Sequence, residues 1–460
     1  MHKGSRRMTE QGTNSPGGNN PGGNNPGGIN PGDNNPGDNK ASDGYSNYVL
    51  WVLFAVYVIN FIDRQVLSVF IGPIKEEFGV SDTHMGLLVG FAFALFYTIA
   101  GIPIARWADR GNRRTIIAIG LTVWSAMTVA TGLTRNFAQM ALARVGVGVG
   151  EAAGSPPAHS LISDYFPPER RARAMGIYSW GVYVGSAIAY LGGGYLRANF
   201  DWRTAFIVLG LPGLVMAVVV RLTVREPPRG MSENVTIPVE PTTLRETLSY
   251  LLGCRGWLYL VAGSSLLSIT GYGVLMWGYE FFGRVHGMAP VEIGVWMAAV
   301  VGLGGSAGAY AGGYLCDRLS RIDVAWYMRL PAIVTLASLP FAALFLLSDA
   351  PREAMAFFFV FYVLSNMYVP AMHTLNQNLA RLRMRATAAA ILLFIVNLVG
   401  AGAGPSLVGF LNDYFAPTYG QLAIRWSLLS VASTGVLGAL LFYLSSRHLA
   451  ADFARRDASL

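Results

Sequence analysis

The sequence predicts an all-α polytopic membrane protein with about twelve transmembrane helices, arranged as two pseudo-symmetric six-helix bundles. First, 53% of the 460 residues are hydrophobic and only 13% are charged, which is about half the charged share of an ordinary soluble domain. Second, apolar runs of about 20 residues recur along the chain, each long enough to cross a bilayer core. Third, short motifs of the first half reappear in the second.

The apolar runs divide into six before a polar stretch and six after it. The first six helices are expected at residues 47–71, 84–107, 114–133, 137–162, 171–197 and 203–221. The second six are expected at residues 256–282, 290–314, 325–347, 353–380, 386–411 and 422–446. The polar stretch is rich in Pro, Glu, Arg and Thr. It predicts a cytoplasmic linker at 223–250 between bundles at 47–222 and 251–448, with a cytoplasmic tail at 449–460.

Residues 1–46 form a polar tail in which a five-residue unit of the type PGGNN repeats. Such a composition has almost nothing to bury, so we expect this tail to be disordered. The tail also lacks the apolar core of a cleavable signal. The first membrane helix is therefore expected to act as an uncleaved anchor.

Lys and Arg collect in alternate loops between the predicted helices. Arg110, Arg113 and Arg114 follow the second helix, and Arg383 and Arg385 precede the eleventh. Because basic residues favour the cytoplasmic side, both termini are predicted to be cytoplasmic, in the cell (inner) membrane. The net charge of +8 lies in short clusters and makes no continuous basic face. We therefore expect no nucleic-acid partner.

The chain lacks the sequence signatures of an enzyme. No Gly-Lys-Ser/Thr nucleotide loop, His/Glu metal motif or serine-nucleophile elbow occurs. Cys254 and Cys316 lie far apart without ligand spacing, so we expect free thiols. The sequence predicts no enzyme, no cofactor and no metal site.

Three pairs of segments indicate an internal duplication. Ala105–Arg114 after the second helix matches Gly313–Arg321 after the eighth. Pro157–Leu161 and Pro370–Leu375 match near the ends of helices four and ten, and two arginine pairs open helices five and eleven. Internal symmetry of this kind is typical of secondary transporters.

Four charged residues lie well away from the ends of the predicted membrane helices of the first half, where an ionisable group is costly and marks a functional candidate. Asp63 and Arg64 lie in the first helix, and Arg144 and Glu151 lie in the fourth. Arg144 and Glu151 are two turns apart and share one face. Asp63 and Arg144 are expected at similar depth, so we expect them to pair if their helices are neighbours.

Two interpretations of these charges remain open. The first is a structural ion pair that fixes helix packing. The second, which we favour, is proton coupling through Glu151, Asp63 and Arg144, because a movable Arg144 beside Glu151 would change the proton affinity of that carboxylate. Arg64 is about 100° around the helix from Asp63. It is expected to serve helix contacts or a substrate anion.

The second half carries milder polar and aromatic groups. This contrast favours an amphiphile with a polar head and an apolar tail, although several of these groups fit equally well as interfacial aromatics or helix caps. The substrate-binding candidates are Arg64, Arg144, Tyr272, Trp277, Asn366 and His373.

The duplicated basic loops predict a gating latch. Asp109 is expected to cap a helix start or to pair with Arg383 or Arg385, and such bonds would break when the two halves rock. The gating candidates are Asp109, Arg110, Arg113, Asp317 and Arg318.

At these residues the chain resembles the major facilitator superfamily from Tyr48 to His448. The loop Ala105–Arg114 is similar to the superfamily signature, except that Ala105 and Asn112 replace glycines. Because Asn tolerates a left-handed backbone, the turn is expected to survive. The resemblance implies the major facilitator fold.

Within that superfamily, three segments resemble the Spinster family of lipid transporters: Asn60–Arg64, Asp109–Arg113 and the stretch from Arg144 through Glu151. This resemblance implies proton-coupled transport of lysophospholipids or sphingosine phosphates. Small organic-anion:proton symporters share similar segments and are the alternative. A non-transporting receptor is disfavoured by the buried charges. We expect a monomer whose partners are the bilayer, protons and a small-molecule or lipid substrate.

Overall fold

The computed structural model describes residues 42–232 and 243–457, which are almost entirely helical. Most of the predicted 1–46 tail lies outside the described residues. The first half comprises α1 Asp43–Val69, α2 Ile71–Phe78, α3 Asp82–Val89, α4 Phe91–Arg110, α5 Arg113–Gly132, α6 Phe137–Glu151, α7 Ser155–Tyr165, α8 Pro168–Asn199 and α9 Trp202–Thr223. In the linker, α10 runs Leu244–Leu252.

The second half repeats this helical pattern with more interruptions. It comprises α11 Arg255–His286, α12 Pro290–Ala299, the π-helix η1 Val300–Gly304, α13 Gly305–Ser320, α14 Trp326–Leu347, α15 Pro351–Asn366, α16 Tyr368–Leu379, the 3₁₀ turn η2 Leu382–Met384, α17 Arg385–Asn397, the π-helix η3 Leu398–Ala403, α18 Gly404–Tyr419, the 3₁₀ turn η4 Gly420–Leu422 and α19 Ala423–Asp457. The last helix was expected to end at residue 446 but continues to Asp457.

Nine helical stretches in the described residues are long and apolar enough to cross a membrane. One of them, Thr387–Asp457, contains two successive spans because α18 and α19 are joined by a turn. Two further long stretches, α6 with α7 and α8, carry more polar residues and complete the predicted twelve. The prediction of an all-helical polytopic fold is confirmed.

Several spans are interrupted near their middle. The break between α6 and α7 follows Glu151, and the break between α15 and α16 follows Asn366. These breaks fall at nearly matching places of the duplicated unit. The π-helices η1 and η3 interrupt spans eight and eleven. Broken helices and π-bulges expose backbone and re-aim side chains, and they occur frequently at binding sites.

The turn between α4 and α5 differs from the expectation in its backbone conformation. Asn112 has an extended backbone with φ −80°, and its side chain accepts a hydrogen bond from the Thr115 backbone N–H at 2.9 Å. The turn therefore forms as expected, although Asn112 does not need a left-handed backbone for it. Asn112, rather than Asp109, caps the start of α5, because Asp109 still lies within the last turn of α4.

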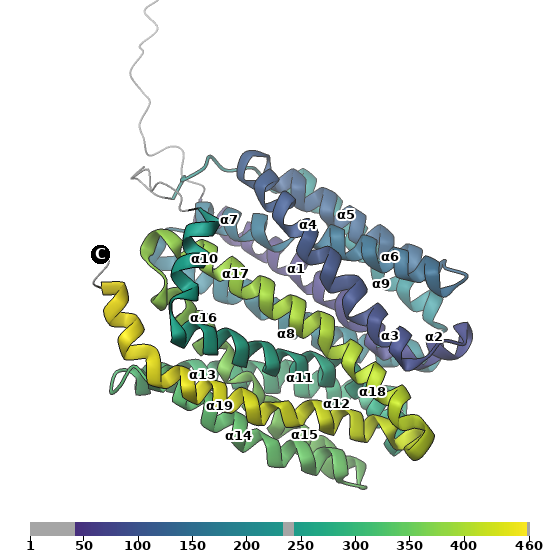
Figure 1. The fold of residues 1–460 in the computed structure, drawn as a ribbon. Helices are drawn as coiled ribbons and strands as arrows, with labels where there is room; N and C mark the ends of the chain where they lie inside the picture. The colour runs from purple at the N-terminus through teal and green to yellow at the C-terminus, as the bar shows by residue number, and fades with distance from the viewer. Residues whose placement is uncertain (1–41, 233–242, 458–460) are drawn as a thin grey trace, which may run out of the picture. The chain divides into compact units, whose positions relative to one another are not determined.

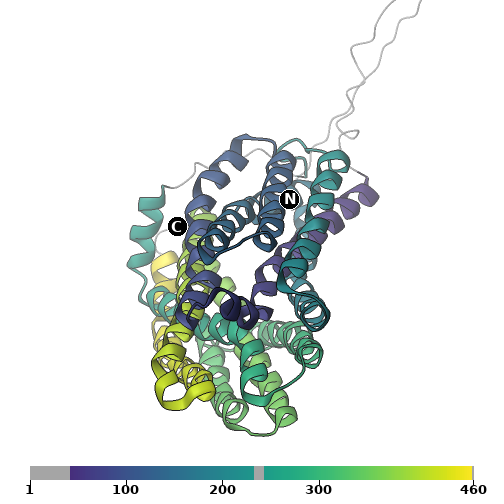
Figure 2. The same cartoon turned by 90° about the vertical axis from the view of Figure 1, so that its right-hand side faces the viewer.

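The helices form two groups that correspond to the two halves of the sequence (Figures 1 and 2). In the first half α1 packs on α8 and α5 packs on α9, while in the second half α19 packs on α11 and α14. We call the end where α1 begins and α19 ends the termini end, and the opposite end, with α2, α3 and α18, the far end (Figure 1).

One hydrophobic cluster, at the far end, contains buried residues from both halves. Val66 and Phe70 of the first half belong to the same buried cluster as Phe281 and Met297 of the second. Three other clusters have their buried residues within single halves: two in the first half, around Trp124 and Ile116, and one in the second half. The far end is therefore where the two bundles have a common core.

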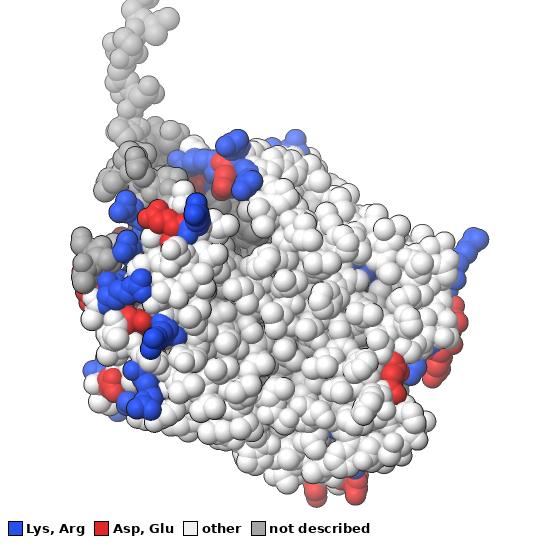
Figure 3. All heavy atoms as spheres, viewed as in Figure 1, with Lys and Arg blue, Asp and Glu red and all other residues white. Residues whose placement is uncertain are grey.

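Charged side chains gather at the two ends of the visible surface, and a broad belt between them is uncharged (Figure 3). Large apolar side chains are exposed along the helices; Leu142 and Leu222 are 72% and 76% exposed. Such exposure is costly in water but favourable against lipid tails. The belt is the surface expected to face the hydrocarbon of a bilayer.

Candidate functional site

A cluster of four charged side chains lies inside the first half; we call Asp63, Arg64, Arg144 and Glu151 the membrane charge cluster. Arg64 Nε donates to Glu151 Oε2 at 2.6 Å, and the Glu151 side chain is 0% exposed. The partner expected for Glu151 was Arg144. The observed partner is Arg64, because α1 is rotated so that Arg64 faces α6.

Arg64 is also enclosed by aromatic rings. Its guanidinium carbon lies 5.1 Å from the ring centre of Phe61 and 4.8 Å from those of Phe93 and Tyr97. Cation–π contacts of this kind stabilise a guanidinium where water is scarce. The rings and Glu151 together hold the Arg64 side chain in place.

Asp63 and Arg144 are neighbours at similar depth, as predicted, but their side chains do not form the predicted ion pair. Arg144 Nη1 donates to the backbone carbonyl of Asp63 at 3.4 Å. Both carboxylate oxygens of Asp63 lack a hydrogen-bond partner among the described residues, and Thr128 and Trp124 of α5 lie beside them. The predicted ion pair does not form because the Asp63 carboxylate points towards α5.

The membrane charge cluster is electrically balanced when all four groups are ionised. Asp63 and Glu151 supply two negative charges, and Arg64 and Arg144 supply two positive charges. Unsatisfied buried atoms remain on Asp63, Arg144 and Glu151. Because an unpaired buried charge is unstable, adding or removing one proton here must alter the pairing of the others.

A cavity of about 460 Å³ lies beside the cluster, between the two halves. Its walls come from α1 and α8 on one side and from the second half on the other. Among the described residues no Asp, Glu, Lys or Arg lines it. The polar lining consists of hydroxyls, amides and one imidazole, and includes Gln65, Ser268, Tyr272, Asn366, His373 and Asn397.

Three of the predicted substrate-binding residues line this cavity: Tyr272, Asn366 and His373. Arg64, Arg144 and Trp277 do not line it. The Trp277 ring is 0% exposed, and its indole N–H donates to the Pro405 carbonyl at 2.9 Å. Trp277 therefore packs the second half. It was a candidate as an aromatic residue of the second half, but its position around α11 turns it towards α18.

The far end is closed by an ion-pair network that the sequence analysis missed. Arg284 of α11 donates to both carboxylate oxygens of Asp82, at 2.5 and 3.2 Å. Lys75 lies 2.6 Å from the same carboxylate. Nearby, Arg197 of α8 donates to Glu280 of α11 at 2.7 Å. We call these five residues the far-end seal, since the Asp82–Arg284 and Arg197–Glu280 ion pairs join the two halves.

Glycines bring the backbones of the two halves together next to the far-end seal. A Cβ atom on Gly194 of α8 would lie 2.6 Å from the carbonyl oxygen of Pro290. One on Gly90 would lie 2.5 Å from the carbonyl oxygen of Gly402. Only glycine permits this approach. The far end is therefore both ion-paired and closely packed.

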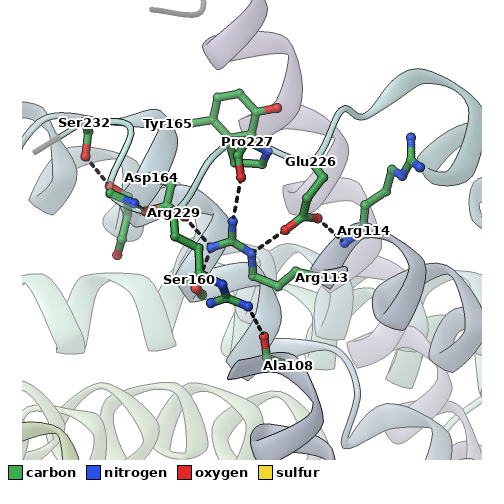
Figure 4. Close-up of polar contacts among 12 residues, drawn as sticks. Ala108, Arg113, Arg114, Ser160, Asp164, Tyr165, Glu226, Pro227, Arg229 and Ser232 are labelled. Atoms are coloured by element: carbon green, nitrogen blue, oxygen red, sulfur yellow. Dashed lines mark hydrogen bonds and ion pairs between the residues drawn. The ribbon is translucent and has the colours of Figure 1, made fainter. Parts of the chain in front are cut away.

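At the termini end Arg113 is buried within the first half (Figure 4). Its guanidinium pairs with Asp164 of α7 and donates to Glu226, after α9, at 2.7 Å. It also donates to the Ser160 hydroxyl at 2.8 Å. Arg113 was a gating candidate, but here it ties three segments of one half together.

The other latch candidates are exposed at the termini end: Asp109, Arg110, Asp317 and Arg318. Asp109 makes no ion pair with any residue that the structure describes. The predicted pairing of Asp109 with Arg383 or Arg385 is absent from this conformation. Both cysteines are free thiols, and both are buried.

Comparison with known proteins adds three findings. The family model of the Major Facilitator Superfamily matches residues 53–405. A protein of Mycolicibacterium smegmatis named MFS-type efflux pump is 33% identical over 405 residues, which cover 87% of this chain and 92% of that protein. The probable L-galactonate transporter of Escherichia coli is 30% identical over 280 residues, covering 59% of this chain and 61% of its own.

One solved structure is similar along nearly the whole chain. It is a bacterial homologue of the human lysosomal transporter Spinster, in an inward-facing and unoccupied conformation. It superposes with a TM-score of 0.82 at 32% identity and covers 90% of this chain and 99% of its own.

Proposed function

Since the chain belongs to the Major Facilitator Superfamily and is similar to Spinster proteins, we propose that it is a proton-coupled transporter of a single-chain amphiphile, working by alternating access. Members of this superfamily are membrane transporters rather than enzymes. Transport of this kind links a proton, a substrate and a conformational change.

The ion pair between Arg64 and Glu151 carries the proposal. A proton that binds the Glu151 carboxylate removes its negative charge and weakens its hold on Arg64. The guanidinium is then available for an anionic group of the substrate. Proton binding and anion binding thus favour each other, which is the coupling that secondary transport requires.

Asp63 and Arg144 supply the second part of the coupling. A buried carboxylate without hydrogen bonds is far less costly when it is neutral. We therefore propose that the Asp63 carboxyl group is protonated in this conformation. When Asp63 loses that proton, the nearby Arg144 compensates the charge. Glu151, Asp63 and Arg144 keep their predicted role in proton coupling, and Arg64 takes over the direct contact with Glu151.

The cavity supports an amphiphile as the substrate. Its volume of about 460 Å³ is in the range of sites for drug-sized ligands, and aromatic and aliphatic side chains such as Phe61, Leu339 and Phe361 line it. Lysophospholipids and sphingosine phosphates, which the Spinster resemblance implies, are the first amphiphiles to test. A small organic acid is the alternative, favoured by the similarity to the probable L-galactonate transporter.

The two ends support the alternating-access part of the proposal. The far-end seal closes one end, while Asp109 and Asp317 are exposed at the other. With the arginine-rich loops on the cytoplasmic side, this conformation is inward-facing. In the opposite conformation we propose that the far-end seal breaks and that Asp109, Arg110, Asp317 and Arg318 form the latch.

Proton movement into proteoliposomes tests the proposed function. An internal pH dye should report acidification when 1-oleoyl lysophosphatidate is added, and no change with galactonate or with empty liposomes. The Arg64→Gln variant should lose the signal because no guanidinium remains for the phosphate. Acidification by galactonate alone would favour the organic-acid alternative. No substrate-dependent signal with either compound would refute proton coupling.

A further inference from the structure

Gln65 is a buried polar residue that the proton-coupling mechanism does not use. It follows Arg64 on α1 and is 2% exposed, and it lines the cavity. Its side-chain oxygen is buried without a hydrogen-bond partner among the described residues. The cost of an unmade hydrogen bond at a buried amide is considerable. The site therefore has an unmet requirement that a ligand can satisfy.

The position of Gln65 on α1 relates it to the rest of the cavity. Tyr57, Phe61 and Gln65 are spaced by four residues, so they form one stripe along the helix, and all three line the cavity. Because α1 runs from the termini end to the far end, Gln65 is the member of this stripe nearest the far end. A ligand entering from the open end meets the aromatic rings first and the amide last.

Phe61 connects this amide to the charge cluster. The guanidinium of Arg64 lies over the Phe61 ring at 5.1 Å, and Phe61 itself lines the cavity. Arg64 and Gln65 thus lie on two sides of one aromatic residue. A substrate whose anionic group approaches Arg64 brings the atoms next to that group close to Gln65.

The chemistry of an amide defines the group that it binds. Its oxygen accepts and its NH₂ donates hydrogen bonds, and which of the two faces the cavity does not matter for a partner that can do both. A hydroxyl is such a partner, and the other cavity-lining groups are likewise uncharged. The site is therefore suited to a neutral hydroxyl that lies beside the anionic group of the ligand.

We propose that Gln65 recognises a free hydroxyl next to the head group of the amphiphile, so that the transporter selects hydroxyl-bearing single-chain lipids over otherwise identical lipids without it. This inference rests on the proposed function and specifies which amphiphiles it applies to. Lysolipids carry such a hydroxyl at the glycerol carbon that a diacyl lipid esterifies. Gln65 would thereby distinguish a lysolipid from a diacyl lipid by chemistry as well as by size.

Two lipids that differ in one atom test the proposal. 1-Oleoyl lysophosphatidate and its analogue without the 2-hydroxyl are each added to proteoliposomes containing the full chain, and the initial rate of uptake is measured against concentration. The wild type is expected to prefer the hydroxyl compound roughly tenfold in kcat/KM, because its analogue leaves the buried amide unpaired. In Gln65→Met, which keeps the side-chain length, the two lipids should have about the same kcat/KM.

A control variant separates recognition from a general loss of packing. Thr131→Val also removes one buried polar group, but the Thr131 hydroxyl already donates to the Met127 carbonyl at 2.9 Å, outside the cavity. This variant should keep the wild-type preference. Equal loss of preference in Thr131→Val and Gln65→Met would contradict the proposal.

The remaining outcomes separate failure of this inference from failure of the proposed function. If the wild type transports both lipids equally well, Gln65 does not recognise the hydroxyl, although amphiphile transport stands. If the wild type transports neither lipid, the proposed function fails and this inference fails with it. Should Gln65→Met not fold, the wild-type comparison, repeated as binding of both lipids to the purified protein, still decides the matter.

Discussion

Replacement of Gly194 by alanine should shift the protein away from the conformation described here. The added Cβ would lie 2.6 Å from the Pro290 carbonyl oxygen and 3.1 Å from the Gly294 Cα. Both contacts join α8 of the first half to α12 of the second half. In the far-end-open conformation proposed above these contacts would be broken, so we expect the clash to destabilise only the closed conformation.

The size of the effect is set by the cost of overpacking. Forcing an extra methyl into a well-packed contact costs about 1–3 kcal/mol. A free-energy difference of that size changes the ratio of two conformations by roughly 5- to 150-fold. Because the two backbones cannot separate without opening the far end, we expect the far-end-open population to rise by a factor in this range.

Gly192 provides a matched control on the same helix. A Cβ there would meet nothing within 4 Å. Gly192→Ala therefore adds the same methyl group and the same gain in helix propensity without the clash.

Spin labels on Glu76 and Arg352, which are exposed at the far end in different halves, report the opening as a distance distribution. Gly194→Ala should broaden it towards longer distances. Identical distributions for the two alanine variants would refute the reasoning.

Three further predictions concern the ends of the molecule. Arg284→Gln should open the far end in the same assay, because the buried Asp82 loses its bidentate partner, at a cost of about 1–3 kcal/mol after solvent screening; an unchanged distance distribution would contradict this. Arg113→Met should lower thermal stability in detergent by about 3–5 kcal/mol, since it leaves Asp164 without its cation, and an unaltered melting temperature would count against it. A single cysteine at Ser42 should react with an impermeant reagent only from the cytoplasmic side; reaction from outside would overturn the topology.

The sequence predicts the fold well because the relevant signals are local. Hydropathy and length alone locate the spans, and the repeated motifs, such as those at Pro157 and Pro370, indicate the duplicated unit. The rule that charges inside a membrane are costly also leads directly to Asp63, Arg144 and Glu151. None of these inferences requires knowledge of how helices are rotated against one another.

The details of the site were harder to predict because they depend on helix rotation. Adjacent residues on α1 point about 100° apart, and nothing in the sequence says which of Asp63 and Arg64 faces Glu151. The same uncertainty placed Trp277 in the cavity, although the structure packs it against α18. The sequence correctly placed Asp63 next to Arg144, but it did not give the direction in which each side chain points.

The far-end seal was missed for another reason. Asp82 and Arg284 are separated by about two hundred residues and meet only because the two halves pack together. In the sequence each looks like an ordinary charged residue at the end of a membrane helix. The one feature of the sequence that could have indicated the seal is that Arg284 lies on the side with few basic residues, where an isolated Arg is unusual.

The central claim is that a proton on Glu151 controls the availability of Arg64. The most direct measurement is the pH dependence of substrate flux in proteoliposomes for the wild type and Glu151→Gln, with the surface variant Asp43→Asn as the control. Glu151→Gln resembles the protonated state permanently. It should exchange substrate across the membrane while losing proton-driven accumulation and most of the pH dependence, whereas the control should behave as the wild type. Full accumulation with unaltered pH dependence in Glu151→Gln would contradict the account and favour a purely structural ion pair.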